Sequence, residues 1–313
     1  MTGVYNRYGQ TVTRSSRMFR FALPMLLSTS AFAAQSVDIE AAANIYQEAA
    51  MREQVRASLV PMPAHIRQLF SADTAAKLSD QQLNAVTAAA KRGFRIDVFE
   101  APALNALAAN LDATTFKKAD AFLISDLGRR MVAADVATAK LDEDTIEKIM
   151  SGQITAPSTP QRDILFDKLE QAARSSESTV QIFLSMGQAV AIGTAVGAGR
   201  DTAAVEESAR KSGEASRPEL EQNMRAPLRR FLAYSYRDMS DADLKHLLAF
   251  LISPPGKHYV SAYIASLGAG FDAMGRRCGE QLGESLRELA QAQVDVPLVG
   301  PAPPAIAAPA RSQ

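Results

Sequence analysis

The feature that most constrains the fold is a stretch of sequence that occurs twice, 128 residues apart. Residues 250–257 read Phe-Leu-Ile-Ser-Pro-Pro-Gly-Lys, and residues 122–129 read Phe-Leu-Ile-Ser-Asp-Leu-Gly-Arg. The same offset continues on both sides of this match, in the pairs Leu111/Met239, Phe116/Leu244 and Val132/Val260. A unit that occurs twice restricts the fold to architectures in which two copies pack together, but it does not indicate a chemistry.

Apolar residues recur at spacings of three and four along the chain, and the alternation typical of strands is nearly absent. The clearest stripe consists of Leu244, Leu247, Leu248 and Leu251. We therefore predict an all-α fold, a helical bundle built from two divergent copies of a helix–corner–helix unit, packed around a pseudo-twofold axis.

The repeated stretch itself has the composition of a corner between two helices. Pro254 disfavours a helical backbone at Ser253, so the preceding helix ends there. Ser253 is expected to cap the next helix, and Gly256 permits a close approach at the bend. The second copy of the motif comprises Phe250, Ser253, Pro254 and Gly256, and the first comprises Phe122, Ser125 and Gly128.

The offset predicts paired helices over residues 113–125 and 241–252, each followed by a second helix that begins near 126 and 254. Because an unpaired buried carboxylate is costly, Asp120 is expected to be exposed or paired, although its counterpart Leu248 is expected to be buried. Ser240, followed three residues later by Asp243, indicates a capping box at the start of the later helix.

The N-terminus has the pattern of an export signal. No acidic residue precedes Asp38, and four arginines are followed by an apolar stretch over 21–33 that ends in Ala-Phe-Ala. At this length the stretch is shorter than the ~20 apolar residues that a membrane-spanning helix needs. We predict a signal peptide over 1–33 and a periplasmic or secreted mature protein.

The remaining chain divides into a first helical repeat over 35–152, a second over 161–292 and a Pro/Ala-rich tail over 293–313, which is expected to be disordered. Residues 151–160 are the strongest candidate for a linker between the repeats. Residues 206–218, rich in charge, Ser and Gly, indicate a surface loop or a frayed helix end.

Charge and cysteine content exclude some classes of function. The chain has 34 basic and 34 acidic residues, and removal of the four arginines in the signal leaves a net charge of −4. A nucleic-acid partner would require a clustered basic face, so none is expected. Cys278 is the only cysteine and cannot form a disulfide within the chain. It is predicted to be inert or partly buried.

Candidate catalytic residues are few. Asp243 and His246 lie three residues apart on one predicted helix, and His258 follows just past the corner, a spacing compatible with an acid–base or metal site. The first copy has Thr115, Lys118 and Arg130 at these positions, so the trio does not belong to the shared unit. We favour the interpretation that these three residues lie on a solvated helix face, and we expect no catalytic residue, metal or cofactor.

Residues 180–199 form a 20-residue stretch without charge that contains Gly193 and Gly197, a helix-contact spacing. A buried helix of the core has the same composition, and this is the favoured interpretation. Contact with a membrane or a lipid surface through residues 180–199 is the alternative.

Three elements in the second copy resemble the signature of a bacterial family of exported proteins, domain of unknown function 2059. They are Tyr236, the run Ser240-Asp241-Ala242-Asp243-Leu244, and residues 250–257. The resemblance is fairly specific over 224–270 and degraded over 96–142, where the prolines are missing; position 251 is Leu where the family often has an aromatic residue. The resemblance implies an exported helical protein and supplies no reaction, cofactor or catalytic residue.

These observations favour an exported, non-catalytic binding or interaction protein of the bacterial envelope. One alternative is an envelope hydrolase with an unrecognised acid–base site, which a deep polar pocket joining Asp243, His246 and His258 would favour. The other is a membrane-associated or lipid-binding protein, since a long apolar groove between helices suits a lipid or a peptide. The expected partner is a protein, a peptide, a lipid or a second copy of the chain.

Overall fold

The computed structural model describes residues 36–72 and 79–294. The predicted export signal and the tail from residue 295 onwards lie outside the described residues. Within them every regular element is a helix, which confirms the all-α prediction, and the only extended pairing is a bridge between Ser36 and Asp112. The helices are α1 (Ile39–Glu48), α2 (Met51–Leu59), α3 (Met62–Ala72), α4 (Asp80–Gly93), α5 (Ile96–Asn110), α6 (Ala113–Leu123), α7 (Asp126–Ala139), α8 (Glu143–Ser151), α9 (Pro160–Ala173), α10 (Ser175–Gly197), α11 (Ala203–Ser235), α12 (Asp241–Ile252) and α13 (Pro254–Val294).

Short polar side chains begin most of these helices, because an oxygen at the N-cap satisfies a backbone N–H that has no partner within the helix. The predicted capping box at Ser240 and Asp243 is present. At the two corners, the backbone N–H of Gly128 donates to Ser125 at 3.0 Å and that of Gly256 donates to Ser253 at 3.1 Å. The predicted second helices therefore begin at residues 126 and 254.

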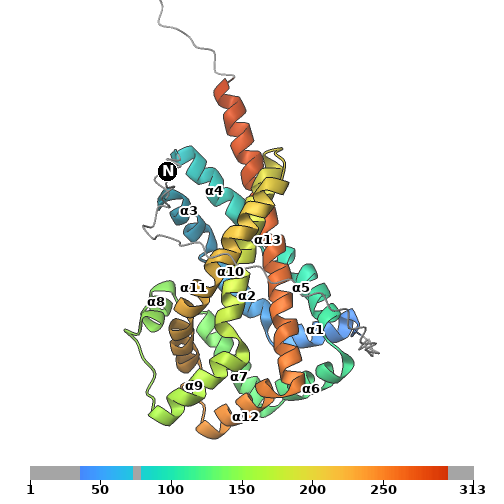
Figure 1. Ribbon diagram of the computed structural model, residues 1–313, viewed down its shortest axis with the longest axis vertical. Coiled ribbons are helices and arrows are strands. Elements are labelled where there is room, and N and C mark those ends of the chain that lie inside the picture. Colours follow the sequence, from blue (N-terminus) through green and yellow to red (C-terminus); the bar gives the residue numbers. More distant parts are fainter. Residues whose placement is uncertain (1–35, 73–78, 295–313) are drawn as a thin grey trace, which may run out of the picture. The chain divides into compact units, whose positions relative to one another are not determined.

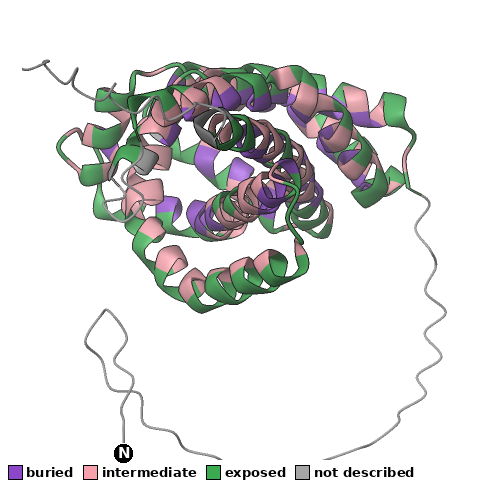
Figure 2. Cartoon of the chain, turned by 90° about the horizontal axis from the view of Figure 1, so that it is seen from above, coloured by how far each residue is buried: buried purple, intermediate pink, exposed green. Residues whose placement is uncertain are grey.

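The predicted burial of the two corner helices agrees in most positions. Leu123 and Leu251 are both buried, and Leu248 is half-buried against the core. Asp120 is half-buried beside the carboxyl group of Glu48. Figure 2 shows the buried residues on the sides of the helices that face one another.

The most extensive helix pairings in the described residues join α10 to α13 and α13 to α5, and Figure 1 shows α10 running beside α13. Glycines on both helices bring the backbones of α10 and α13 together. A Cβ added at Gly193 would lie 2.2 Å from the carbonyl oxygen of Arg276, and one added at Gly279 would lie 2.2 Å from that of Val190. The glycine spacing in residues 180–199 therefore serves a helix contact inside the protein.

Helix α10 also exposes Phe183 and Val196, which are 57% and 50% exposed. Among the described residues, α10 is the one helix whose length and apolar composition would suffice to cross a membrane. It packs against α13 and α11, but only 33% of its apolar span is buried, which differs from the expectation of a buried central helix.

Two sets of helices make matching contacts. Helix α1 packs on α2, α5 and α6, and α9 packs on α10, α11 and α12. Helix α2 also contacts α5 and α7, and its counterpart α10 contacts α11 and α13. In the same way, α6 contacts α7 and α12 contacts α13. The matching extends to the turn before α2 and α10, where Ala50 (φ 49°) and Arg174 (φ 53°) both adopt the left-handed conformation. These two residues are 124 positions apart, four fewer than the offset at the corners.

The prediction for residues 206–218 was wrong. These residues belong to α11, whose exposed face carries ion pairs at helical spacing, from Arg210 to Glu207 and Glu214 and from Lys211 to Glu207. Such pairs stabilise a helix whose Ser and Gly content alone would disfavour it. Residues 152–159 do link α8 to α9 without a helix, as predicted.

Candidate functional site

The three residues predicted as a polar site are not joined by any hydrogen bond or ion pair in the described part of the chain. Asp243 accepts two hydrogen bonds from Arg130, at 3.0 and 2.8 Å, and these lower its pKa. His258 lies with Nδ1 3.6 Å from Asp112, and His246 is exposed. The described residues also contain no group of three His, Cys, Asp or Glu side chains placed to bind a metal.

Arg130, the partner of Asp243, occupies the position in the first copy of the sequence motif that His258 occupies in the second. Arg130 and His258 stand 128 residues apart, and each reaches an acidic side chain at the N-terminus of the opposite corner helix. Asp112 caps α6, and Asp243 completes the capping box of α12. These side chains therefore connect the two corners, and this structural role accounts for the presence of charged residues here.

Cys278 is buried and free, and burial raises the pKa of its thiol to about 12. A Cβ added at Gly93 would lie 2.3 Å from the Cα atom of Cys278, so α4 and α13 touch at this point. The cysteine is a small packing residue, in agreement with the prediction that its thiol is inert.

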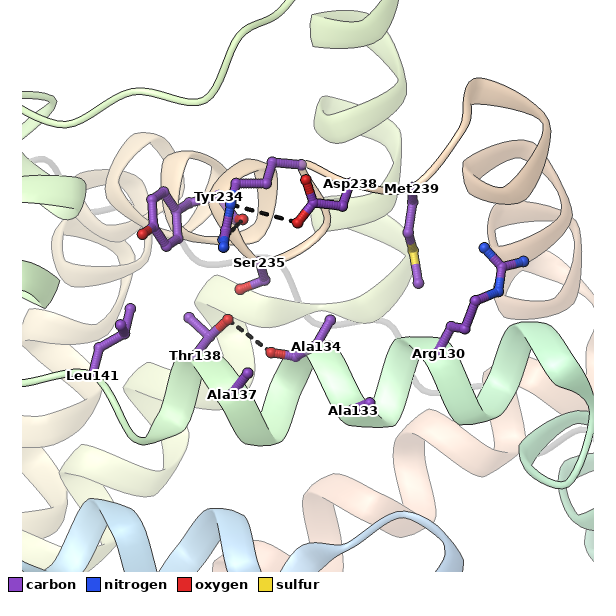
Figure 3. Close-up of a pocket in the computed structure, with 11 residues that line it drawn as sticks. Arg130, Ala133, Ala134, Ala137, Thr138, Leu141, Tyr234, Ser235, Asp238 and Met239 are labelled. Atoms are coloured by element: carbon purple, nitrogen blue, oxygen red, sulfur yellow. Dashed lines mark hydrogen bonds and ion pairs between the residues drawn. The ribbon is translucent and has the colours of Figure 1, made fainter.

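One hollow in the described residues is a pocket of about 390 Å³ at the surface, between α7 and the end of α11 (Figure 3). Its polar side chains already have partners within the chain. Thr138 donates to the carbonyl oxygen of Ala134 at 2.8 Å, Ser235 donates to that of Phe231 at 2.9 Å, and Arg237 stacks over the ring of Tyr234. Few polar side chains of this surface pocket are therefore free to bind a ligand.

A second hollow, which we call the central cavity, has a volume of about 310 Å³, is open to solvent on one side, and is lined by buried and half-buried residues. Seven segments of the chain meet around it, and most of the lining is apolar. The lining residues are Ala49, Gln54, Met131, Val132, Asp135, Leu169, Ala173, Ser175, Ser178, Thr179, Leu232, Tyr236, Leu247, Leu251, Tyr259, Val260, Tyr263 and Ile264.

Asp135 is the only carboxyl group in this lining, and no Lys, Arg or His lines the cavity. Burial raises its pKa to about 7, against the smaller opposing effect of the Tyr236 hydroxyl, which lies within hydrogen-bonding reach. Asp135 is half-buried, and its accessible part lines this hollow. Among the described residues it forms no ion pair.

Three tyrosines, Tyr236, Tyr259 and Tyr263, line the cavity around Asp135. The rings of Tyr259 and Tyr263 have centroids 6.0 Å apart and are tilted by 48°. Burial raises the pKa of all three phenols, and the charge of Asp135 adds to this shift. The phenols are therefore neutral throughout the physiological pH range, and Asp135 is the only lining group that changes its charge there.

The lining also contains residues from equivalent positions of the repeat. At the offset of 128 these are the pairs Met131/Tyr259, Val132/Val260 and Asp135/Tyr263, from α7 and α13. At the offset of 124 they are the pairs Ala49/Ala173 and Gln54/Ser178, which flank the two left-handed residues. The two sets of matching helices therefore meet at this cavity.

A further acidic pair lies close to the cavity. One carboxylate oxygen of Glu48, Oε2, is buried without a hydrogen-bond partner, and Asp120 lies beside it. Burial first, and then the charge of Asp120, raises the pKa of Glu48 to about 7. With a proton on Glu48 the group can donate a hydrogen bond to Asp120, which accounts for the pairing of two acids.

The sequence contained one signal for this cavity that the prediction did not use. Asp135 follows Met131 by four residues and Val132 by three, so it interrupts an apolar stripe on a predicted helix. Tyr236 and the pair Tyr259 and Tyr263 lie on helices far from Asp135 in sequence, so no local pattern joined them to it. No family model, curated protein or solved structure matches the chain.

Proposed function

We propose that this chain is an exported, non-catalytic binding protein, in which two copies of a helical unit enclose a ligand site at the central cavity. The observation that carries the proposal is the lining itself. It is mostly apolar and buried or half-buried, and it contains one carboxyl group and three phenols. A largely apolar hollow with a few convergent polar groups is the usual form of a small-molecule site.

The matching contacts of the two sets of helices support duplication of a single unit. The unit comprises α1, α2, α5, α6 and α7 in the first copy, and α9 to α13 in the second. The stacked rings of Phe122 and Phe250, with centroids 4.1 Å apart and planes within 4°, lie where a pseudo-twofold axis would bring equivalent residues together. The cross-pairs of Arg130 with Asp243 and of His258 with Asp112 are arranged in the same way.

Binding fits the cavity better than catalysis. Acid–base catalysis uses two titratable groups whose pKa values differ, so that one donates and the other accepts a proton. The lining offers one carboxyl group, and the phenols beside it stay neutral. Asp243 and His258, the acid–base candidates of the alternative hydrolase, contact charged residues at the helix corners instead.

The bacterial envelope is the proposed location, on the strength of the export-signal pattern and the resemblance to domain of unknown function 2059. The residues that carry that resemblance build one side of the cavity. Tyr236 lines it, and Phe250 packs against Tyr259, which lines it as well. The signature would then preserve the wall of a binding site rather than a set of catalytic residues.

The proposal is tested with the mature chain and three probes of similar shape: phenethyl alcohol, phenethylammonium and hydrocinnamate. Titration calorimetry and native mass spectrometry should show that at least one probe binds with a stoichiometry of one. Ala173→Phe places a ring in the cavity from the end of α9 and should abolish that binding. The matched variant Ala137→Phe places the same ring in the surface pocket and should leave binding unchanged.

Thermal melts establish that both variants are folded before binding is compared. If no probe binds to the wild-type chain, the cavity is not a ligand site. Equal loss of binding in both variants would also contradict the proposal. Probe binding that survives Ala173→Phe but vanishes in Ala137→Phe would move the site to the surface pocket.

A further inference from the structure

We infer that the central cavity is selective for a small organic cation, an ammonium group on an apolar body, with Asp135 as its counter-ion and the rings of Tyr236, Tyr259 and Tyr263 around its charge. This inference rests on the proposed function and specifies the class of ligand. It follows from the composition and placement of the lining rather than from a single residue.

The electrostatics of the lining favour positive charge. Asp135 is its only ionisable group that titrates near neutrality, and no cationic side chain of the lining neutralises it. A carboxylate removed from water and left unpaired is unfavourable, which is why the group holds a proton in the empty cavity. An ammonium ion supplies the missing partner, whereas a carboxylate ligand would meet a like charge.

The three aromatic rings also favour a positively charged ligand. The face of an aromatic ring carries partial negative charge and attracts a cation within about 6 Å of its centre, most strongly where water is excluded. Tyr236 and Tyr259 are buried, and Tyr263 joins them from the next turn of α13. The apolar remainder of the lining, such as Leu232, Leu247 and Ile264, suits a hydrocarbon body attached to the ammonium group.

Binding should be linked to the loss of a proton from Asp135. The groups that face Asp135 are Tyr236 from α11 and Tyr259 and Tyr263 from α13, and these phenols keep their protons near neutral pH. The other lining helices, α2, α9, α10 and α12, contribute Gln54, Ser175, Ser178, Thr179 and apolar side chains, none of which titrates. Cation affinity should therefore rise about tenfold per pH unit up to about pH 7 and then level off.

The decisive experiment compares phenethylammonium with phenethyl alcohol, which has the same body without the charge. By calorimetry at neutral pH, the wild-type chain should bind the ammonium probe at least tenfold more tightly than the alcohol, and hydrocinnamate should not bind. Titrations in two buffers with different heats of ionisation should show release of a proton. Asp135→Asn should weaken ammonium binding at least tenfold and should weaken alcohol binding much less.

Two ring variants separate the aromatic contribution from the carboxylate. Tyr263→Phe keeps the ring face and should retain ammonium affinity, whereas Tyr263→Leu should weaken it several-fold without the same effect on the alcohol. Thermal melts confirm that each variant is folded; burial already favours the neutral form of Asp135, so the neutral side chain of Asp135→Asn should be tolerated.

The outcomes distinguish this inference from the proposed function. If the alcohol binds as tightly as the ammonium probe and Asp135→Asn changes neither, the cavity is a binding site but not a cation site. Tighter binding of hydrocinnamate would overturn the charge preference directly. Absence of binding by all three probes would overturn the proposed function itself.

Discussion

Glu48 and Asp135 show how residue-scale burial controls ionisation inside this helical protein. Each has a pKa of about 7 because burial disfavours its charged form; Asp120 raises the pKa of Glu48 further, whereas the Tyr236 hydroxyl partly opposes the shift at Asp135. The unfolded chain would release both protons near their ordinary values of 4.5 and 3.8. The folded state thus holds protons that the unfolded state has lost.

This difference predicts a pH dependence of stability. Between about pH 4.5 and 7 the folded state binds more protons than the unfolded state, so the free energy of unfolding falls as the pH rises. Glu48→Gln removes one such proton and keeps a donor for Asp120. We expect the variant to match the wild type near pH 4 and to exceed it at pH 8 by on the order of 1 kcal/mol, after allowance for the partial exposure of Glu48.

Urea unfolding at several pH values measures this difference. The control is Glu219→Gln, an exposed glutamate on α11, which should not change the pH dependence. An advantage of the Glu48 variant that is equally large at both ends of the pH range would show that its carboxyl group ionises normally in the folded state.

At the scale of single elements, the pair α10 and α13 depends on glycines that meet from both sides. Gly193 and Gly197 on α10 lie against the backbone of α13, and Gly279 and Gly283 on α13 lie against that of α10. The nearest atoms are backbone atoms, which cannot rotate away as a side chain does. A methyl group at these positions must therefore move a whole helix.

Two substitutions on α13 test this contact. Gly279→Ala gains about 1 kcal/mol in helix propensity but should lose about 1–3 kcal/mol to overpacking, so we expect net destabilisation. Gly268→Ala gives the same gain in propensity where an added Cβ meets nothing within 4 Å, so it should stabilise by about 0.5–1 kcal/mol. Opposite signs in thermal or urea unfolding would support the close contact, and equal signs would contradict it.

Sequence patterns predicted some elements well for a physical reason. Caps at Ser240 and Ser253 involve partners three residues away, so the relevant contacts are already present in the local sequence. Residues 206–218 were mispredicted because the prediction rested on their Ser and Gly content. It did not take into account the ion pairs of Arg210 at helical spacing. Arg174 gave no signal, because its left-handed backbone is imposed by the packing of α9 and α10 on either side.

At the scale of the whole molecule, the offset of 128 predicted the corners and the helices on either side of them. The cavity was not predictable, because Asp135, Tyr236 and Tyr259 come from three helices whose meeting depends on long-range packing. The correspondence of Ala50 with Arg174 was not apparent from the sequence for another reason. The two side chains differ, and the two residues are 124 positions apart, whereas matching residues at the corners are 128 apart.

Export makes a prediction for the mature chain. The Ala-Phe-Ala sequence at residues 31–33 should direct cleavage so that the secreted or periplasmic protein begins at Ala34 or Gln35. Intact-mass measurement of the protein from a periplasmic extract tests this. Recovery of a chain that begins at Met1 or Met18 would contradict it, and Ala33→Arg should block processing as a control.

The proposed duplication, which places Asp135 and Tyr263 at matching positions, has a consequence for how such a site can arise. In a dimer of two identical chains, an acid near the axis would face its own twin across a space of a few ångströms, and both could not ionise together. Joining both halves in one polypeptide frees each side to mutate alone. One side of this cavity carries the acid and the other carries the phenol. A fused pair can therefore evolve an asymmetric chemistry that a symmetric assembly forbids.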